Sequence, residues 1–229
     1  MVRFVILCLG RSGSSHLQSL LDSHPDITCF GEVFSDRAPA DGPGFINSQY
    51  KDEGAYFEHL VETCEVPVMG FKLPMNSIKA HPESARLVAG DPAMRVIRLS
   101  RANLLAQLIS RRLQNTTRVS HSLQGGYAGA TVHIDVDWAL RALELMERDE
   151  ETLDGLANSH PCHRILYEEL GDQGRVEDVQ RFLGVEPAEL RSWFEKLRQR
   201  PLHETVENWD ELVATLRDTR FGHFAVEAL

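Results

Sequence analysis

The sequence has 229 residues, long enough for one sizeable hydrophobic core, so we predict a single domain over residues 1–229. Hydrophobic residues make up 42% and charged residues 25% of the chain, which excludes disordered and fibrous classes. The formal net charge of −10 argues against a nucleic-acid partner, because binding to phosphate backbones needs a basic surface.

The chain opens with a continuous apolar run, FVILCL, which predicts a buried parallel strand over residues 4–9. After a turn, leucines spaced at i, i+3 and i+4 predict a helix that packs back on this strand, and residues 26–30 predict a second strand. Residues 2–9 are too short for a signal peptide or a membrane span. We therefore expect a cytoplasmic protein that does not act at a membrane.

Strands alternate with helices along the rest of the chain. Polar, glycine-containing stretches at 35–56 and 116–133 predict long loops, which in compact domains are more often functional than idle. We expect further strands at 67–73, at 93–100 and from 163, and helices at 104–109, 138–148, 175–183, 187–198 and 207–217. This order predicts an α/β fold with three layers, in which helices flank a central parallel sheet.

The four cysteines, Cys8, Cys29, Cys64 and Cys162, lie far apart and form no CxxC pair. This spacing indicates neither a zinc site nor a disulfide framework. The HPCH stretch at 160–163 lacks further spaced ligands and is better explained as a loop before a strand. We predict that the protein uses no metal.

The turn GRSGSS, residues 10–15, joins the first strand to the first helix. Backbone N–H groups and the positive end of the helix converge at such a turn, which therefore binds anions. The nucleotide-kinase form, GxxxxGK[ST], carries a lysine that is missing here, because His16 follows Ser15. Arg11 offers a forked cation instead. A purely steric reason for the small residues of this turn stays open.

Five segments, in order along essentially the whole chain, resemble the sulfotransferases that use 3′-phosphoadenosine 5′-phosphosulfate (PAPS), in their bacterial, carbohydrate and tyrosylprotein branches. They are RSGSSHLQSLLDSHPDITCFGE, GFKLP, VIRLSRANLLAQLIS, ILYEEL followed by FLGV, and VENWDEL. The resemblance implies a P-loop-like fold and transfer of a sulfuryl group from PAPS to a hydroxyl or amine. The product would be adenosine 3′,5′-bisphosphate (PAP). The acceptor would be a small molecule such as a carbohydrate or another alcohol.

The resemblance also assigns roles to residues near the first turn. Glu32, just past the second strand, would act as general base on the acceptor. Lys72, on the third strand, and Arg11 would stabilise charge on the transferring group. The donor phosphosulfate would be held by the turn and the start of the helix, that is, by Arg11, Ser12, Gly13, Ser14, Ser15 and His16.

The 3′-phosphate would be held by Arg101 and Ser110. They are nine residues apart, where many cytosolic relatives have eight, so Arg98, Arg111 and Arg112 stay as alternatives. A basic C-terminal segment would close over the nucleotide through Arg198 and Arg200, near Lys196, although the RKGxxGDW form of the cytosolic branch is absent.

Two other functions stay open at this point. One is a small-molecule kinase of the P-loop type, and the other is a non-catalytic nucleotide or sugar binder on the same scaffold. The loops at 35–56 and 116–133 are expected to line the acceptor pocket, with Tyr50, Phe57, Tyr127 and His133 as candidate lining residues. The sequence does not choose the acceptor or the oligomeric state.

Overall fold

The computed structural model describes residues 1–35, 44–117, 129–194 and 200–226. The chain divides into two compact units. The sheet unit comprises residues 1–100 and 150–192, and the helical unit comprises residues 101–149 and 193–229. This division does not test whether the chain forms the single domain predicted from the sequence, which stays a prediction.

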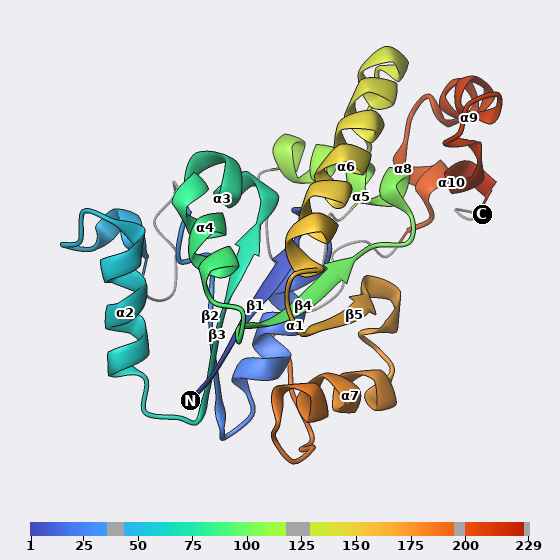
Figure 1. Ribbon diagram of the computed structural model, residues 1–229. Helices are drawn as coiled ribbons and strands as arrows, with labels where there is room; N and C mark the ends of the chain where they lie inside the picture. The colour runs from blue at the N-terminus through green and yellow to red at the C-terminus, as the bar shows by residue number, and fades with distance from the viewer. Residues whose placement is uncertain (36–43, 118–128, 195–199, 227–229) are drawn as a thin grey trace. The chain divides into compact units, whose positions relative to one another are not determined.

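The sheet unit is built on five parallel strands (Figure 1) in the order β2-β3-β1-β4-β5. Their bounds are β1 Val2–Cys8, β2 Ile27–Phe30, β3 Val68–Pro74, β4 Arg95–Ser100 and β5 Cys162–Leu166. The central strand, β1, is buried over most of its length, as its apolar run predicts. The predicted α/β fold with a central parallel sheet flanked by helices is confirmed.

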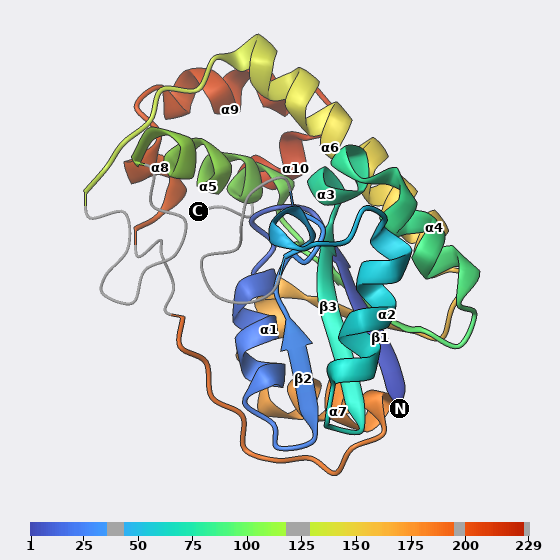
Figure 2. The ribbon, with the colours of Figure 1, turned by 90° about the vertical axis from the view of Figure 1, so that its left-hand side faces the viewer.

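One face of the sheet packs against α1 (Ser14–Asp22) and α7 (Gln173–Leu183). Phe4, on β1, belongs to this core and leaves no room for a side chain at Gly70 on β3, where an added Cβ would lie 2.3 Å from the ring. Close packing of these strands therefore requires the glycine. Figure 2 shows α1 on one face of the sheet and α2 on the other.

The opposite face of the sheet carries helices that the sequence analysis did not predict. They are α2 (Glu53–Thr63), α3 (Met75–Ala80) and α4 (Pro82–Gly90), and a short 3₁₀ helix, η1 (Phe45–Asn47), precedes them. The prediction of a loop throughout 35–56 is therefore wrong at η1 and at the start of α2. Asp52 begins α2 by accepting a hydrogen bond from the Ala55 amide at 2.8 Å, a start signal that the polar composition of the stretch obscured.

Helix α6 (Val136–Ala157) extends beyond the predicted 138–148, and its second half is tied to the sheet by the buried Arg98. The Arg98 guanidinium, 1% exposed, lies 2.9 Å from Asp154 and also contacts Glu150. Burial alone would raise the pKa of Asp154, but Arg164 and Arg98 outweigh it and hold that pKa below its ordinary value. The alternative role of Arg98 as a phosphate ligand is wrong, because its guanidinium holds α6 in place.

The helical unit contains α5 (Leu104–Thr117), the first half of α6, α8 (Leu202–Thr205), α9 (Trp209–Arg217) and α10 (Gly222–Val226). The Asn208 side chain bonds both backbone groups of Ile134, at 3.0 and 2.9 Å. The VENWDEL segment thus clamps the chain just before α6. No helix among residues 1–35, 44–117, 129–194 and 200–226 is long and apolar enough to cross a membrane.

The predicted helix at 187–198 is wrong over residues 187–194, which are extended, and 195–199 lie outside the described residues. Instead of forming helical hydrogen bonds, this segment bonds to other parts of the sheet unit. The Gln180 side chain, for example, bonds the Ala188 backbone at 2.7 and 3.3 Å. Tertiary contacts have overridden the local helical pattern. A 3₁₀ turn, η2 (Tyr167–Glu169), follows β5.

Candidate active site

The turn between β1 and α1 has an unusual backbone. Arg11 has φ +68° and Gly13 has φ +85°, both in the left-handed region. At Gly13 a Cβ would also lie 2.4 Å from the Tyr167 ring, so only glycine fits. Arg11 keeps a conformation that disfavours residues with a side chain, and strain of this kind clusters at functional sites.

The N-terminal end of α1 is well suited to an anion. Gly13 caps the helix without a side-chain hydrogen bond, and no acidic residue lies in the first turn. The first amides of a helix have no partner within the helix, and they carry its positive dipole end. Ser12 is fully buried, and its hydroxyl has no hydrogen-bond partner among the residues that the structure describes. The Ser12 hydroxyl is therefore a buried donor for which the described residues provide no acceptor.

Cys8 ends β1 below this turn. Burial raises the pKa of its thiol, although the hydroxyl of Ser14 and the charge of Lys72 act in the opposite direction. A neutral, buried thiol is a poor nucleophile. Cys8 thus serves as a small apolar residue beneath the turn.

Lys72 and Glu32 are brought together by the register of two strands. Phe30 on β2 pairs with Phe71 on β3, and the next amide along β3, that of Lys72, donates to the Gly31 carbonyl at 3.1 Å. Glu32 follows directly and leaves the sheet at its carboxyl edge. In open α/β sheets, ligands bind at this edge.

The Lys72 side chain links the turn to the carboxylate. Its Nζ donates to Ser15 Oγ at 2.9 Å and lies 3.6 Å from Glu32 Oε1. Lys72 is 5% exposed, whereas the Glu32 side chain is 36% exposed. A buried ammonium thus stands against the first turn of α1, with a solvent-accessible carboxylate beside it. Such a pair offers a cation for developing negative charge and a base for a proton.

The sequence analysis missed Tyr167. This residue begins η2 directly after β5, and its ring packs against Gly13 on the turn. Its position after the carboxyl end of a strand is the signal that could have found it, because all five strands end at the same edge.

The residues predicted to hold the 3′-phosphate belong to the helical unit. Arg101 directly follows β4 and is half-buried, and Ser110 is buried on α5. Arg200 lies 3.1 Å from Glu204, and the Arg112 guanidinium lies 5.8 Å from the centroid of the Trp138 ring. The phosphate-binding roles of these residues stay predictions, and Arg198, Lys196 and Tyr127 lie outside the described residues.

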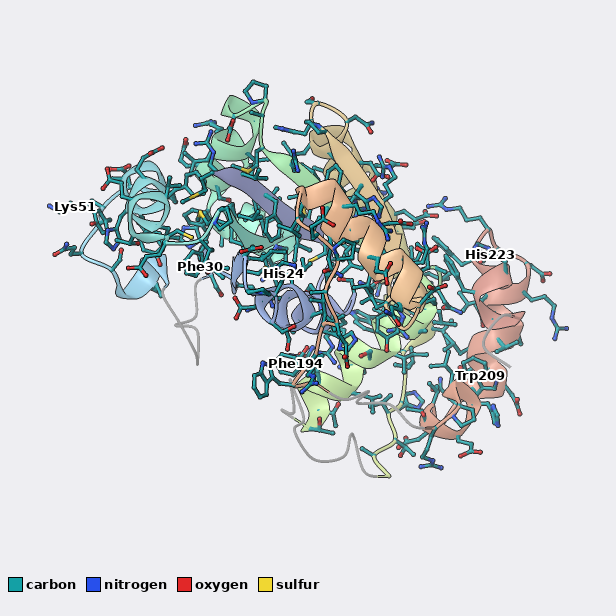
Figure 3. All side chains as sticks on the ribbon, turned by 90° about the horizontal axis from the view of Figure 1, so that it is seen from below. His24, Phe30, Lys51, Phe194, Trp209 and His223 are labelled. Carbon is teal, nitrogen blue, oxygen red and sulfur yellow. The ribbon has the colours of Figure 1, made fainter. Side chains whose placement is uncertain are left out.

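The DSHP stretch after α1 is structural. Asp22 accepts a hydrogen bond from the Cys29 amide at 2.9 Å, and His24 Nδ1 accepts one from the Asp26 amide at 3.0 Å. His24, labelled in Figure 3 beside α1, is 4% exposed. These bonds connect the end of α1 to the start of β2. Within the described residues, no group of three or more His, Cys, Asp or Glu gathers as a metal site.

Two solved structures resemble this chain. A crystal structure of a sulfotransferase from Alicyclobacillus acidocaldarius matches with a TM-score of 0.54 and 19% identity, and the match covers 100% of this chain and 95% of that one. A mouse sulfotransferase, SULT7A1, complexed with PAP, matches with a TM-score of 0.49 and 14% identity over 100% and 89% of the two chains. No protein-family model and no curated protein matches the sequence. The chain therefore shares the fold of the bacterial sulfotransferase.

Proposed function

We propose that the protein transfers a sulfuryl group from PAPS to a hydroxyl or amine of a small-molecule acceptor and releases PAP. For an alcohol, the acceptor oxygen forms a bond to sulfur while the bond between sulfur and the phosphate oxygen breaks. Glu32 takes the proton of the acceptor hydroxyl, and the electron pair of the broken bond stays on the phosphate of PAP.

One observation carries this proposal, the position of Lys72 Nζ between Ser15 Oγ and Glu32 Oε1. An anion seated on the amides of the turn lies next to this ammonium, which is then placed to stabilise charge on the leaving oxygen. The accessible carboxylate beside it meets the acceptor from the solvent side. The turn has no lysine of its own, and β3 supplies the cation from outside it.

The other residues of the turn complete the proposed donor site. Arg11 and the amides of Ser12, Gly13, Ser14, Ser15 and His16 would hold the phosphosulfate, and Arg101, Ser110, Arg198 and Arg200 would hold the 3′-phosphate. The shared fold with the bacterial sulfotransferase supports the same reaction class. A metal has no role in this proposal.

Replacement of Glu32 by Gln tests the mechanism. This substitution keeps the shape of the side chain but removes the base, so transfer from labelled PAPS should fall by roughly 10²–10⁴-fold. PAP affinity, measured by calorimetric titration, should stay within about twofold, because Glu32 does not hold the nucleotide. Glu58→Gln, at an exposed position on α2, is the matched control and should leave both unchanged.

Full activity of Glu32→Gln would remove Glu32 from the mechanism. PAP binding without transfer to any of a panel of sugars, phenols, alcohols and amines would favour a non-catalytic binder. Mg²⁺-dependent turnover of ATP would favour the kinase. The same panel, assayed with PAPS that carries the label in its sulfuryl group, would identify the acceptor.

A further inference from the structure

Residues 184–192, which we call the strap, leave α7 and run beside α1 in an extended path (Figure 2). Gly184 ends α7 with φ +80°, which turns the chain away from the helix. Gln180 bonds the Ala188 backbone, and Val185 and Leu190 pack against the core of the sheet unit. The strap is thus held along its length by specific contacts.

The C-terminal end of α1 provides two more anchors. His24 Nε2 donates to the Glu186 carbonyl at 3.0 Å, since Nδ1 of the same ring accepts from the Asp26 amide. Ser23 Oγ accepts from the Arg191 amide at 2.9 Å. These contacts lie at the end of α1 that is farther from the donor turn.

The last anchor lies at the opposite end of the helix. His16 is the third residue of α1, and its Nδ1 lies 2.8 Å from Ser192 Oγ. A hydroxyl both donates and accepts, so Ser192 fits either tautomer of the ring. The strap therefore ends on the first turn of α1, where the proposed donor site lies.

We infer that Ser192 is a positioning residue for the donor turn. Its hydroxyl fixes the His16 ring and, through it, the first turn of α1 in the conformation that binds the anionic end of the nucleotide. The inference rests on the proposed function, because the ligand it invokes is the nucleotide of that function. Coupling between two sites is reciprocal, so nucleotide binding should also hold the strap more firmly.

PAP affinity of single and double variants tests the inference. Ser192→Ala should weaken PAP binding by about tenfold, the loss expected for one hydrogen bond. Ser192→Thr keeps the hydroxyl and should bind within about twofold of the wild type. In combination with His16→Ala, the Ser192→Ala change should add little further loss, because both remove the same contact.

Ser23→Ala is the matched control. It removes the acceptor of the neighbouring Arg191 amide from the same strap without touching His16. This variant should lose stability but keep the wild-type PAP affinity. Equal affinities of Ser192→Ala and the wild type, equal losses in Ser192→Ala and Ser23→Ala, or additive losses in the double variant would each overturn the inference.

Hydrogen exchange in the free protein separates this inference from the proposed function. The Leu17 amide donates to the Gly13 carbonyl at 3.1 Å in the first turn of α1. Ser192→Ala should speed its exchange and Ser23→Ala should not, whether or not PAP binds. Failure of the wild type to bind PAP would contradict the proposed function. An unchanged exchange rate of the Leu17 amide in Ser192→Ala would contradict the positioning role of Ser192.

Discussion

The two ends of α1 differ in how their polar groups are satisfied. At the C-terminal end, Ser23 donates to the Leu20 carbonyl and accepts from Arg191, and both ring nitrogens of His24 are hydrogen-bonded. At the N-terminal end, the cap lacks a side-chain hydrogen bond and the buried hydroxyl of Ser12 has no partner among the described residues. The side chains of Ser23 and His24 are thus bonded to the protein's own backbone, whereas the Ser12 hydroxyl is a buried donor without an acceptor among the described residues.

This difference suggests that the C-terminal end of α1 contributes mainly to stability and the N-terminal end mainly to ligand binding. A helix end whose polar groups are all hydrogen-bonded within the protein stabilises the fold, but it has no donor or acceptor left for a ligand. A strained backbone and a buried hydroxyl without a partner cost stability, and such features cluster where a protein binds a ligand. Substitutions at the two ends should therefore have different signatures.

The largest effect is expected at Gly13. Replacement by Ala places a Cβ 2.4 Å from the Tyr167 ring and forces a left-handed conformation on a residue with a side chain. We expect a loss of about 3–5 kcal/mol in the free energy of unfolding, from backbone strain and overpacking together. Urea denaturation measures this loss.

Gly10→Ala is the control for Gly13→Ala. Gly10 lies in the same turn, but an added Cβ there has nothing within 4 Å and its φ is not in the left-handed region. It should change stability by less than about 1 kcal/mol. Similar losses in the two variants would show that the turn does not need glycine at position 13 in particular.

Lys72→Met comes next. Methionine fills the buried site without the charge, so turnover should fall by roughly 10²–10³-fold while stability changes little or rises. Lys79→Met, at an exposed position near the end of α3, should have no effect on turnover. A transfer assay together with urea denaturation tests both variants. Normal turnover of Lys72→Met would show that the Lys72 ammonium is not needed for transfer.

His24→Ala should show the opposite signature. The change leaves the Asp26 amide and the Glu186 carbonyl without their partner, at a cost of about 2–3 kcal/mol in unfolding free energy. PAP affinity of the folded protein should stay unchanged. His203→Ala, at an exposed position, should cost less than about 0.5 kcal/mol. A loss of PAP affinity in His24→Ala would mean that the two ends of α1 are not separate.

The sequence predicts the sheet well because its signals are strong. A short apolar run such as 4–9, bounded by turn residues, is typical of a buried strand, and the glycine and serine residues that follow mark the turn. The helix predicted at 187–198 failed for a physical reason. Its apolar spacing suits a helix, but the bonds of Gln180 and Ser23 to distant backbone groups hold 187–194 extended, and these bonds exist only in the folded protein.

The candidate site was predictable in part. Glu32 and Lys72 each lie at or near the carboxyl end of a predicted strand, which indicated a shared edge. Their ion pair depends on the register between β2 and β3, which strand propensity does not encode. Tyr167 follows the predicted strand that begins at 163, but it was missed because its contact with Gly13 joins residues far apart in the sequence.

The smallest effect is expected at Ser12, and it gives the sharpest test of the comparison. Removal of a buried hydroxyl that has no partner among the described residues relieves a desolvation cost, so Ser12→Ala should leave stability unchanged or raise it by up to about 1 kcal/mol. If the hydroxyl donates a hydrogen bond to the nucleotide, the same variant should bind PAP several-fold more weakly.

Ser23→Ala should have the opposite effects, a loss of stability and an unchanged PAP affinity, because the Ser23 hydroxyl bonds only to the protein's own backbone. Urea denaturation and calorimetric titration of this pair of Ser→Ala variants would decide the matter. A destabilised Ser12→Ala with normal PAP affinity would show that both ends of α1 serve only the fold.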